Sequence, residues 1–130
     1  MIIDSHAHLH FDRFDADRAE VIQRAHDAGV THMVTIGTHR ESSLAALALA
    51  QSEASVFATA GIHPLAVDRF EESDWQVLEA LWANGRIVGI GETGLDYYYT
   101  PETQGLQRQL FQRHLIAGTT FNLPVVVHIR

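Results

Sequence analysis

The stretch Ile2-Ile3-Asp4-Ser5-His6-Ala7-His8, at the start of the chain, distinguishes between two folds that share one order of elements. Its first residues are apolar, as in a short β-strand, and two histidines follow with one residue between them. An open, doubly wound sheet that binds dinucleotides carries a glycine-rich GxGxxG turn after its first strand. Because His-Ala-His stands at this place instead, the stretch favours a (β/α)8 barrel.

Beyond this stretch, short apolar runs alternate with longer segments of helical periodicity. The predicted strands are Ile2–Ser5, His32–Ile36, Val56–Ala60, Ile87–Ile90 and Pro124–His128. Several of these runs are apolar on both faces, which is typical of parallel strands covered by helices. The spacing between the runs leaves room for one helix after each of the first four strands.

Capping signals and apolar stripes predict these four helices. The first runs from an N-cap at Asp17 to Gly29, the second opens at Thr38 with Glu41, the third opens at Ser73 with Gln76 and ends at Asn84-Gly85, and the fourth runs from Glu102 to Phe121. A TIM-type (β/α)8 barrel usually takes about 250 residues. Residues 1–130 are therefore interpreted as a single partial barrel domain of the α/β class, supplying about the first five strands and four helices.

Composition and charge restrict the class of protein. A hydrophobic content of 46% is that of an ordinary soluble globular protein, and no apolar run reaches the ~18 residues of a membrane span. The N-terminus lacks the regions of a signal peptide and the chain has no cysteine, so a cytoplasmic location is expected. The formal net charge of −7 argues against a broad basic surface for gripping duplex DNA.

His6 and His8 are the first candidate metal ligands. Side chains two residues apart in a strand point to the same face, so both imidazoles can reach one metal ion. Glu92 follows the fourth predicted strand, where a carboxylate can bridge two divalent cations and activate water for phosphoester hydrolysis. The position of the pair at the end of the first strand favours a metal site over the alternative of two surface or capping histidines. Glu92, taken alone, could equally cap a following helix.

Two further histidines follow the third and fifth predicted strands. His63 and His128 each admit a core or edge interpretation, and Arg130 could bind phosphate or be a solvated residue. The candidates His6, His8, His63, Glu92 and His128 nevertheless all lie at or just past the C-terminal ends of predicted strands. In a barrel these ends converge on one mouth, so the set predicts a metal-centred site. Its imidazoles and carboxylate suit Zn²⁺, Mn²⁺ or Fe²⁺ better than Mg²⁺.

The remaining aromatic and imidazole side chains have no predicted place among the ligands. His10 continues the alternation of His6 and His8, but beyond the end of the predicted strand. Structural or solvent-exposed positions are predicted for His26, His32, His39 and His114. The run Tyr97-Tyr98-Tyr99 could stack bases at the rim of the site or pack as a loop cluster.

Four motifs, in this order along the chain, resemble those of the TatD family of metal-dependent deoxyribonucleases. They are Ile3-Asp4-Ser5-His6-Ala7-His8-Leu9, Gly61-Ile62-His63-Pro64, Gly91-Glu92-Thr93-Gly94-Leu95-Asp96-Tyr97-Tyr98 and Leu123-Pro124-Val125-Val126-Val127-His128-Ile129-Arg130. The stretch Tyr97-Tyr98-Tyr99-Thr100-Pro101-Glu102-Thr103 is most similar to the YcfH-like branch of the family.

The resemblance implies a TIM-barrel hydrolase that cleaves DNA phosphodiester bonds by two-metal activation of water. Carried over by motif, His6 and His8 would hold one metal ion, His128 would hold the second, and Glu92 would bridge them as the catalytic carboxylate. His63 and Arg130 would bind the substrate near the scissile phosphate. The implied cofactors are two divalent ions (Mg, Mn or Zn), and the implied partner is DNA, single-stranded or at strand ends, without a membrane.

The chain departs from this family in length. Members are about twice as long, near the usual size of a barrel, and their second half brings a further histidine and an aspartate to the metals. A five-stranded piece would leave a sheet edge open, so self-association of the chain is expected. Two alternatives remain: an amidohydrolase-like enzyme acting on an amide, ester or lactone, and an inactive truncated fragment. The first often uses a modified lysine as the metal bridge, and this chain has no lysine.

Overall fold

The computed structural model describes residues 1–130 and contains one five-stranded parallel sheet. Its strands are β1 (Ile2–Ala7), β2 (Val30–Ile36), β3 (Val56–Ala60), β4 (Ile87–Leu95) and β5 (Val125–Ile129). The strands lie in the order in which they occur along the chain, and every neighbouring pair is parallel. A doubly wound sheet would reverse its strand order at a switch point, so the predicted barrel-type order is confirmed.

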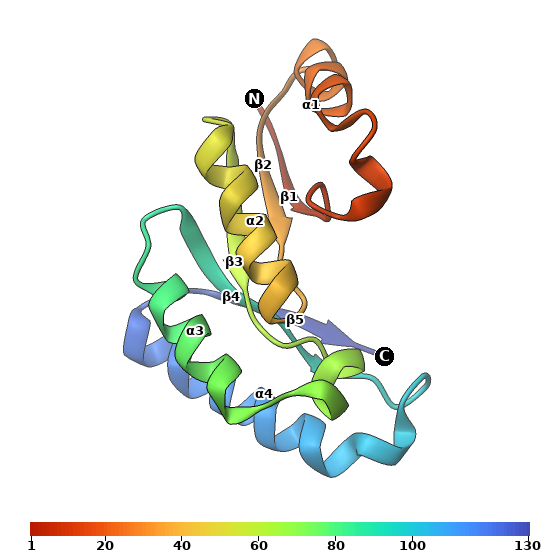
Figure 1. Ribbon diagram of the computed structural model, residues 1–130, viewed down its shortest axis with the longest axis vertical. Coiled ribbons are helices and arrows are strands. Elements are labelled where there is room, and N and C mark those ends of the chain that lie inside the picture. The colour runs from red at the N-terminus through yellow and green to blue at the C-terminus, as the bar shows by residue number, and fades with distance from the viewer.

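Four helices connect the strands. They are α1 (Arg18–Asp27), α2 (Arg40–Ser52), α3 (Glu72–Trp82) and α4 (Gln104–Phe121), and the 3₁₀ turns η1 (Asp12–Phe14), η2 (Pro64–Arg69) and η3 (Pro101–Thr103) precede α1, α3 and α4. The helices α2, α3 and α4 lie along one side of the curled sheet (Figure 1). None of the helices is both long and apolar enough to cross a membrane.

The hydrophobic core lies between the sheet and these helices. Val56, Ala58 and Ile90 of the inner strands are fully covered, and Leu78 of α3 and Leu110 of α4 pack into the same cluster. The burial of such apolar side chains stabilises the layer by about 1.5–3 kcal/mol for each one fully covered. The strands β3 and β4 therefore match the prediction of strands that are apolar because both faces are covered, whereas β2 does so only in its second half.

The two outer strands differ from that prediction. β1 has no buried residue, and its Ile2 and Ile3 are exposed. In β5, Val127 and Ile129 are also exposed. Each of these strands has a neighbour on one side alone, so the backbone groups of the other side lack ladder partners.

The starts of α2 and α3 correct the predicted capping signals. The N-cap of α2 is His39 rather than Thr38, and its Nδ1 accepts a hydrogen bond from the backbone N–H of Ser42 at 3.3 Å. The helix α3 begins after Glu71, which forms a reciprocal capping box with Asp74, so the predicted pair Ser73 and Gln76 lies inside the helix. Carboxylates and imidazole nitrogens accept hydrogen bonds from the free N–H groups of a first turn as hydroxyls do. The threonine and serine signals therefore predict the start of α2 one residue early and that of α3 two residues late.

The helices α1 and α4 begin close to the predicted positions. Asp17 occupies the N-cap of α1 but makes no side-chain capping bond. The helix α4 begins at Gln104 rather than Glu102, because Pro101 opens a separate 3₁₀ turn. These shifts leave the candidate site unchanged, because its residues lie at the strand ends.

Candidate metal centre

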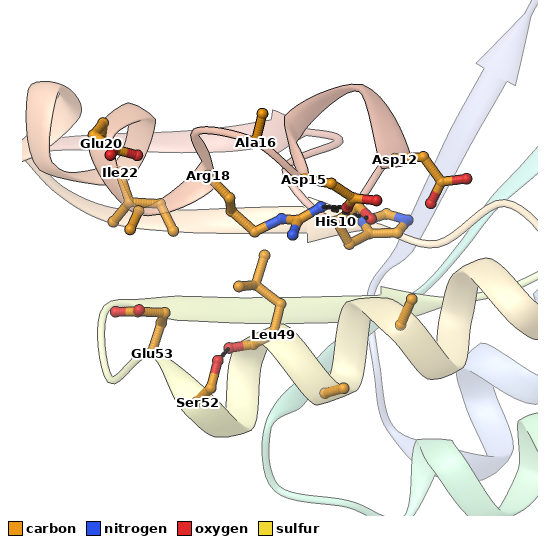
Figure 2. Close-up of a pocket in the computed structure, with 13 residues that line it drawn as sticks. His10, Asp12, Asp15, Ala16, Arg18, Glu20, Ile22, Leu49, Ser52 and Glu53 are labelled. Carbon is orange, nitrogen blue, oxygen red and sulfur yellow. Dashed lines mark hydrogen bonds and ion pairs between the residues drawn. The ribbon is translucent and has the colours of Figure 1, made fainter.

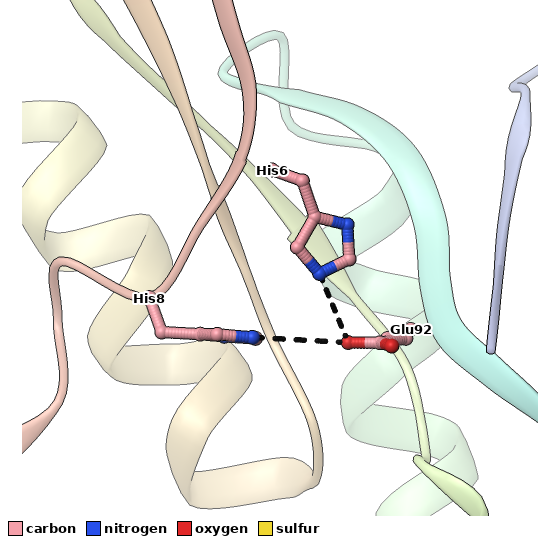
Figure 3. A group of neighbouring side chains, drawn as sticks. All are labelled: His6, His8 and Glu92. Atoms are coloured by element: carbon pink, nitrogen blue, oxygen red, sulfur yellow. Dashed lines mark ion pairs between the residues drawn. The ribbon is translucent and has the colours of Figure 1, made fainter.

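The carboxylate of Glu92 lies between two pairs of imidazoles. Its Oε2 is 3.3 Å from Nε2 of His6 and 3.9 Å from Nε2 of His8 (Figure 3). Its Oε1 is 3.3 Å from Nδ1 of His128 and 3.8 Å from Nε2 of His63. Each pair forms, with Glu92, a group of three donor atoms that lie within 4.8 Å of one another. The predicted residues at the ends of four different strands are thus brought together around one carboxylate.

The parallel sheet explains why these residues meet. His6 lies in β1, His8 directly follows it, and His128 lies in β5, while His63 is the N-cap of η2 after β3. Glu92 lies inside β4, which continues to Leu95 rather than ending at Ile90 as predicted. All these positions are toward the C-terminal ends of parallel strands, where the active sites of barrels lie.

Glu92 leaves the regular ladder of β4. The register between β4 and β5 shifts between Ile90 and Thr93, and the backbone N–H of Glu92 donates to the carbonyl of Gly37 at 2.8 Å. The preceding Gly91 has a φ of +125°, and a Cβ atom there would lie 2.5 Å from the carbonyl oxygen of Val126. Glycine is required at this position because a side chain would meet β5.

Two hydrogen bonds determine which imidazole nitrogens carry a lone pair toward Glu92. Nδ1 of His8 is 2.9 Å from the carbonyl oxygen of Ile36, which can only accept, so this nitrogen donates and Nε2 is left unprotonated. Nε2 of His128 likewise donates to Oδ2 of Asp96 at 2.9 Å, which leaves Nδ1 unprotonated. Metal-binding histidines commonly have their second nitrogen held by a carbonyl or carboxylate in this way.

His63 has the opposite arrangement. Its Nδ1 accepts a hydrogen bond from the backbone N–H of Leu65 at 3.0 Å, so the neutral ring carries its proton on Nε2, the atom that faces Glu92. The distances alone would admit His63 as a metal ligand, but the hydrogen bond leaves no lone pair on Nε2. His63 therefore faces the centre as an N–H donor.

The environment favours neutral rings at His8 and His63 and an ionised carboxylate at Asp96. Burial lowers the pKa of His63 to about 4, and burial is also the main cause that lowers the pKa of His8. Burial of Asp96 opposes its ionisation, yet hydrogen bonds from the backbone of Tyr99, from His128 and from the backbone of Tyr98 hold its pKa below the usual value. Neutral imidazoles are the form that binds metal, so the donor set fits a divalent cation such as Zn²⁺ or Mn²⁺.

Asp96 and Gln107 were not singled out by sequence reasoning. Asp96 is fully buried and holds His128, and the amide of Gln107, also fully buried, accepts from the backbone N–H of Asp96 at 2.7 Å. The one sequence signal for Asp96 is its position in the same glycine-rich motif as Glu92, just after the end of the strand. The role of Gln107 has no such signal, because it lies inside an amphipathic helix.

The other histidines lie outside the cluster. His10 is buried and bonds Thr35 and Ser42 through its two nitrogens, each at 2.7 Å, so it holds η1 against α2 and the sheet. His114 was predicted to be structural or exposed, and it is fully buried, where its Nε2 accepts from the backbone N–H of Ile62 at 3.0 Å. Arg130 lies against the rings of Tyr98 and Tyr99, with its guanidinium carbon 4.9 Å from each centroid.

Two cavities differ in their suitability for an anionic substrate. The cluster opens into a cavity of about 270 Å³ lined by His8, His63, Glu92 and Arg69 among others. A larger one of about 650 Å³ lies between the segment of η1 and α1 and the helix α2 (Figure 2). It is lined by the acidic residues Asp12, Asp15, Glu20 and Glu53, while its Arg18 is paired with Asp15 at 2.7 Å. Those carboxylates would repel a phosphate, so the smaller cavity is the candidate substrate site.

Comparison with known proteins identifies the family. A family model described as TatD related DNase matches residues 3–130. The uncharacterized metal-dependent hydrolase YcfH of Escherichia coli (strain K12) is 34% identical over 132 residues, covering 99% of this chain and 49% of that protein. The 3'-5' ssDNA/RNA exonuclease TatD of Cronobacter sakazakii is 36% identical over 118 residues, covering 91% of this chain and 45% of that protein.

A solved structure gives the same result for the fold. The crystal structure of YJJV, a TatD homolog from Escherichia coli K12, aligns with a TM-score of 0.92 and 29% identity, over 99% of this chain and 51% of that chain. The chain thus spans about half the length of the relatives it matches. Since the family model covers nearly every residue, the chain belongs to the TatD-related DNase family, a family with metal-dependent hydrolases among its members, and corresponds to the N-terminal half of its barrel.

Proposed function

We propose that this chain carries the N-terminal part of a hydrolase that cleaves DNA phosphodiester bonds with two divalent metal ions. The observation that carries the proposal is the position of Glu92, with one carboxylate oxygen toward His6 and His8 and the other toward His128 and His63. A carboxylate with imidazoles on both sides suits two ions, because each oxygen is available to a different ion. When bound, such a pair lowers the pKa of a water molecule and polarises the phosphoryl oxygens.

In this proposal each donor atom has a role. His6 and His8 would hold one ion, His128 would hold the other, and Glu92 would be shared between the two. The free lone pairs on His8 and His128 support these assignments, because the second nitrogen of each ring is occupied by a carbonyl or carboxylate. The mixed nitrogen and oxygen donor set favours Mn²⁺ or Zn²⁺ over Mg²⁺, which prefers more oxygen ligands.

His63 acts on the substrate rather than on the metals. Its Nε2–H points toward the centre, and its pKa of about 4 keeps the ring neutral near pH 7. An N–H donor placed beside the metals can bind a non-bridging phosphate oxygen and stabilise the negative charge that grows there during hydrolysis. Arg130, two residues beyond His128, contributes a positive charge to the same side of the site.

The distribution of arginines supports a polyanionic substrate. Four of the nine cationic side chains, Arg18, Arg24, Arg40 and Arg113, pair with carboxylates, and Arg86 binds backbone carbonyls. The four others have no carboxylate partner: Arg13 lies in η1, Arg69 ends η2, Arg108 lies in α4 and Arg130 follows β5. In a chain of net charge −7, Arg69 lines the cavity that contains Glu92, so its charge is available to a phosphate there.

The preferred substrate in this proposal is single-stranded DNA or a strand end. The chain offers a few unpaired arginines rather than the broad basic surface that a duplex requires. The similar TatD protein of Cronobacter sakazakii carries the name of a 3'-5' ssDNA/RNA exonuclease, which is in line with this choice.

A nuclease assay tests the proposal directly. We expect Mn²⁺-dependent release of nucleotides from single-stranded DNA by the chain, abolished by Glu92→Ala and unchanged by Glu20→Ala, which removes an exposed carboxylate of α1. Calorimetry with Mn²⁺ on the same proteins separates metal binding from hydrolysis. Bound metal without any release of nucleotides from DNA would overturn the assignment of nuclease activity to this chain.

We also propose that the open sheet edges associate with a second copy of the chain. The strand β1 pairs with β2 alone and β5 pairs with β4 alone, and exposed isoleucines lie on both. The β5 edge of one copy placed against the β1 edge of another would satisfy backbone groups and cover apolar side chains at once.

A further inference from the structure

The loop that directly follows β4, the strand that carries Glu92, exposes two aromatic rings. Tyr98 is 68% exposed and Tyr99 is 57% exposed. Their ring centroids are 4.8 Å apart with the ring planes at 83°, and the guanidinium of Arg130 lies 4.9 Å from both. Neither ring belongs to the hydrophobic core, so burial does not explain their position. Exposed aromatics grouped with an arginine mark a surface suited to ligand binding.

The backbone of this loop is held by the residue that also orients His128. Oδ1 of Asp96 accepts hydrogen bonds from the backbone N–H groups of Tyr98 at 3.1 Å and Tyr99 at 2.7 Å. Its Oδ2 accepts from Nε2 of His128 at 2.9 Å. One buried carboxylate therefore positions both the pair of tyrosines and an imidazole that faces Glu92.

The far end of the loop is fixed by Gln107. The amide nitrogen of this buried side chain donates to the carbonyl of Asp96 at 3.0 Å and to that of Thr100 at 2.8 Å. Both ends of the segment are thus tied to α4. Because the loop is already ordered, a ligand that stacks on its rings pays little conformational entropy.

From this geometry we propose that Tyr98 and Tyr99, with Arg130 against them, form a stacking platform for a base of single-stranded DNA. The inference rests on the proposed function and extends it by placing the nucleotide next to the scissile phosphate. Tyrosine rings stack on any base, and arginine can add its planar face and its charge toward the neighbouring phosphate. The platform would hold the strand without reading its sequence, since every base has a flat face.

Binding of DNA without hydrolysis tests this platform. Fluorescence anisotropy in EDTA is measured with a short labelled oligodeoxythymidine and with matched oligonucleotides that carry one abasic nucleotide at successive positions. For Tyr98→Ala/Tyr99→Ala we expect the Kd of the intact oligonucleotide to rise about tenfold or more, from the loss of base stacking. With an abasic nucleotide at the position that faces the platform, the unsubstituted protein and the variant should bind equally.

The conservative variant Tyr98→Phe/Tyr99→Phe is the matched control, because it keeps both rings and should bind as the unsubstituted protein does. Equal weakening of intact and abasic oligonucleotides by the alanine variant, or no weakening of either, would overturn the platform. A second measurement needs no variant: photocrosslinking with a 5-bromodeoxyuridine oligonucleotide should label Tyr98 or Tyr99, and labelling confined to other segments would contradict the inference.

These readouts separate the platform from the proposed hydrolysis. Both are taken without divalent cations, so they do not depend on turnover. If base stacking is observed but DNA is not hydrolysed, the platform stands and the nuclease proposal is overturned. If DNA is hydrolysed but intact and abasic strands bind alike, the nuclease proposal stands and the platform is overturned.

Discussion

Nε2 of His128 lies 2.9 Å from Oδ2 of Asp96, and this contact determines which nitrogen of His128 faces Glu92. Because the carboxylate accepts a hydrogen bond from Nε2–H, the lone pair is on Nδ1, 3.3 Å from the carboxylate of Glu92. The orientation of one proposed ligand thus depends on a neighbour that does not face the centre itself.

The substitution Asp96→Asn should weaken metal binding without removing a proposed ligand. The amide can donate to Nε2 of His128, which would move the ring proton to Nδ1. We expect a loss of about 10–100-fold in affinity for one Mn²⁺ ion, measured by calorimetry. Asp68→Asn, which changes an exposed carboxylate in η2, is the control. Unchanged affinity in Asp96→Asn would contradict this role.

The substitution His63→Ala should leave metal binding intact and slow the hydrolysis of DNA. Since Nε2 of His63 carries a proton, its removal should leave the number of bound Mn²⁺ ions unchanged while nucleotide release falls by about 10²-fold. His63→Gln, which keeps an N–H donor near the same place, should restore part of the rate. If calorimetry shows one ion fewer in His63→Ala, the residue is a ligand instead.

Arg69→Ala should weaken binding of single-stranded DNA through charge alone. Arg69 lines the cavity that contains Glu92 and has no carboxylate partner. Loss of one phosphate contact should reduce the slope of log K against log salt by about 0.7, equally for every sequence. Titrations at several salt concentrations measure this slope. Arg24→Ala removes a cation of α1 and should leave the slope unaltered.

The stability of the fold should fall between pH 6.5 and pH 4 because of His114. Burial lowers the pKa of this imidazole from 6.5 to about 4 in the folded chain. Below pH 6.5 the unfolded chain binds a proton that the folded chain does not, so the free energy of unfolding decreases as the pH falls, by up to about 3 kcal/mol. Urea unfolding at pH 7 and pH 5 measures the difference.

A substitution separates His114 from the other histidines in that measurement. His114→Gln should be less stable at pH 7 but should show a smaller loss on acidification, whereas His32→Gln, at an exposed position, should behave as the unsubstituted chain does. An identical pH dependence in His114→Gln would assign the effect to other groups.

Self-association through the sheet edges should appear in sedimentation. We expect the chain to form dimers or larger species at micromolar concentration, and Ile129→Lys on β5 to shift it toward monomer, since a charge on an edge strand opposes pairing. Ile116→Lys, at an exposed position of α4, is the matched control. A single monomeric species at all concentrations for the unsubstituted chain would refute the proposal.

The sequence alone predicts the order of strands and helices, and it predicts that the candidate residues lie at the C-terminal edge of the sheet. The alternation of strands and helices is a local property of side-chain periodicity, and parallel strands bring their C-terminal ends to one side in any barrel. The sequence therefore predicts that His6, His8, Glu92 and His128 lie near one another. The predicted helix starts are less accurate. Glu71 caps α3 in place of Ser73, and His39 caps α2 in place of Thr38.

The tertiary structure alone decided which nitrogen carries the proton in His8 and in His128. The lone pair of His8 depends on the carbonyl of Ile36, and that of His128 depends on Asp96. The proton of His63 depends instead on a local contact, with the N–H of Leu65 in the same 3₁₀ turn. The register irregularity that turns Glu92 toward four imidazoles is likewise a property of the packed sheet. The partners of His8 and His128 lie about 30 positions away in the sequence, so they meet only when the chain has folded. No local sequence pattern therefore indicates which nitrogen of these rings donates.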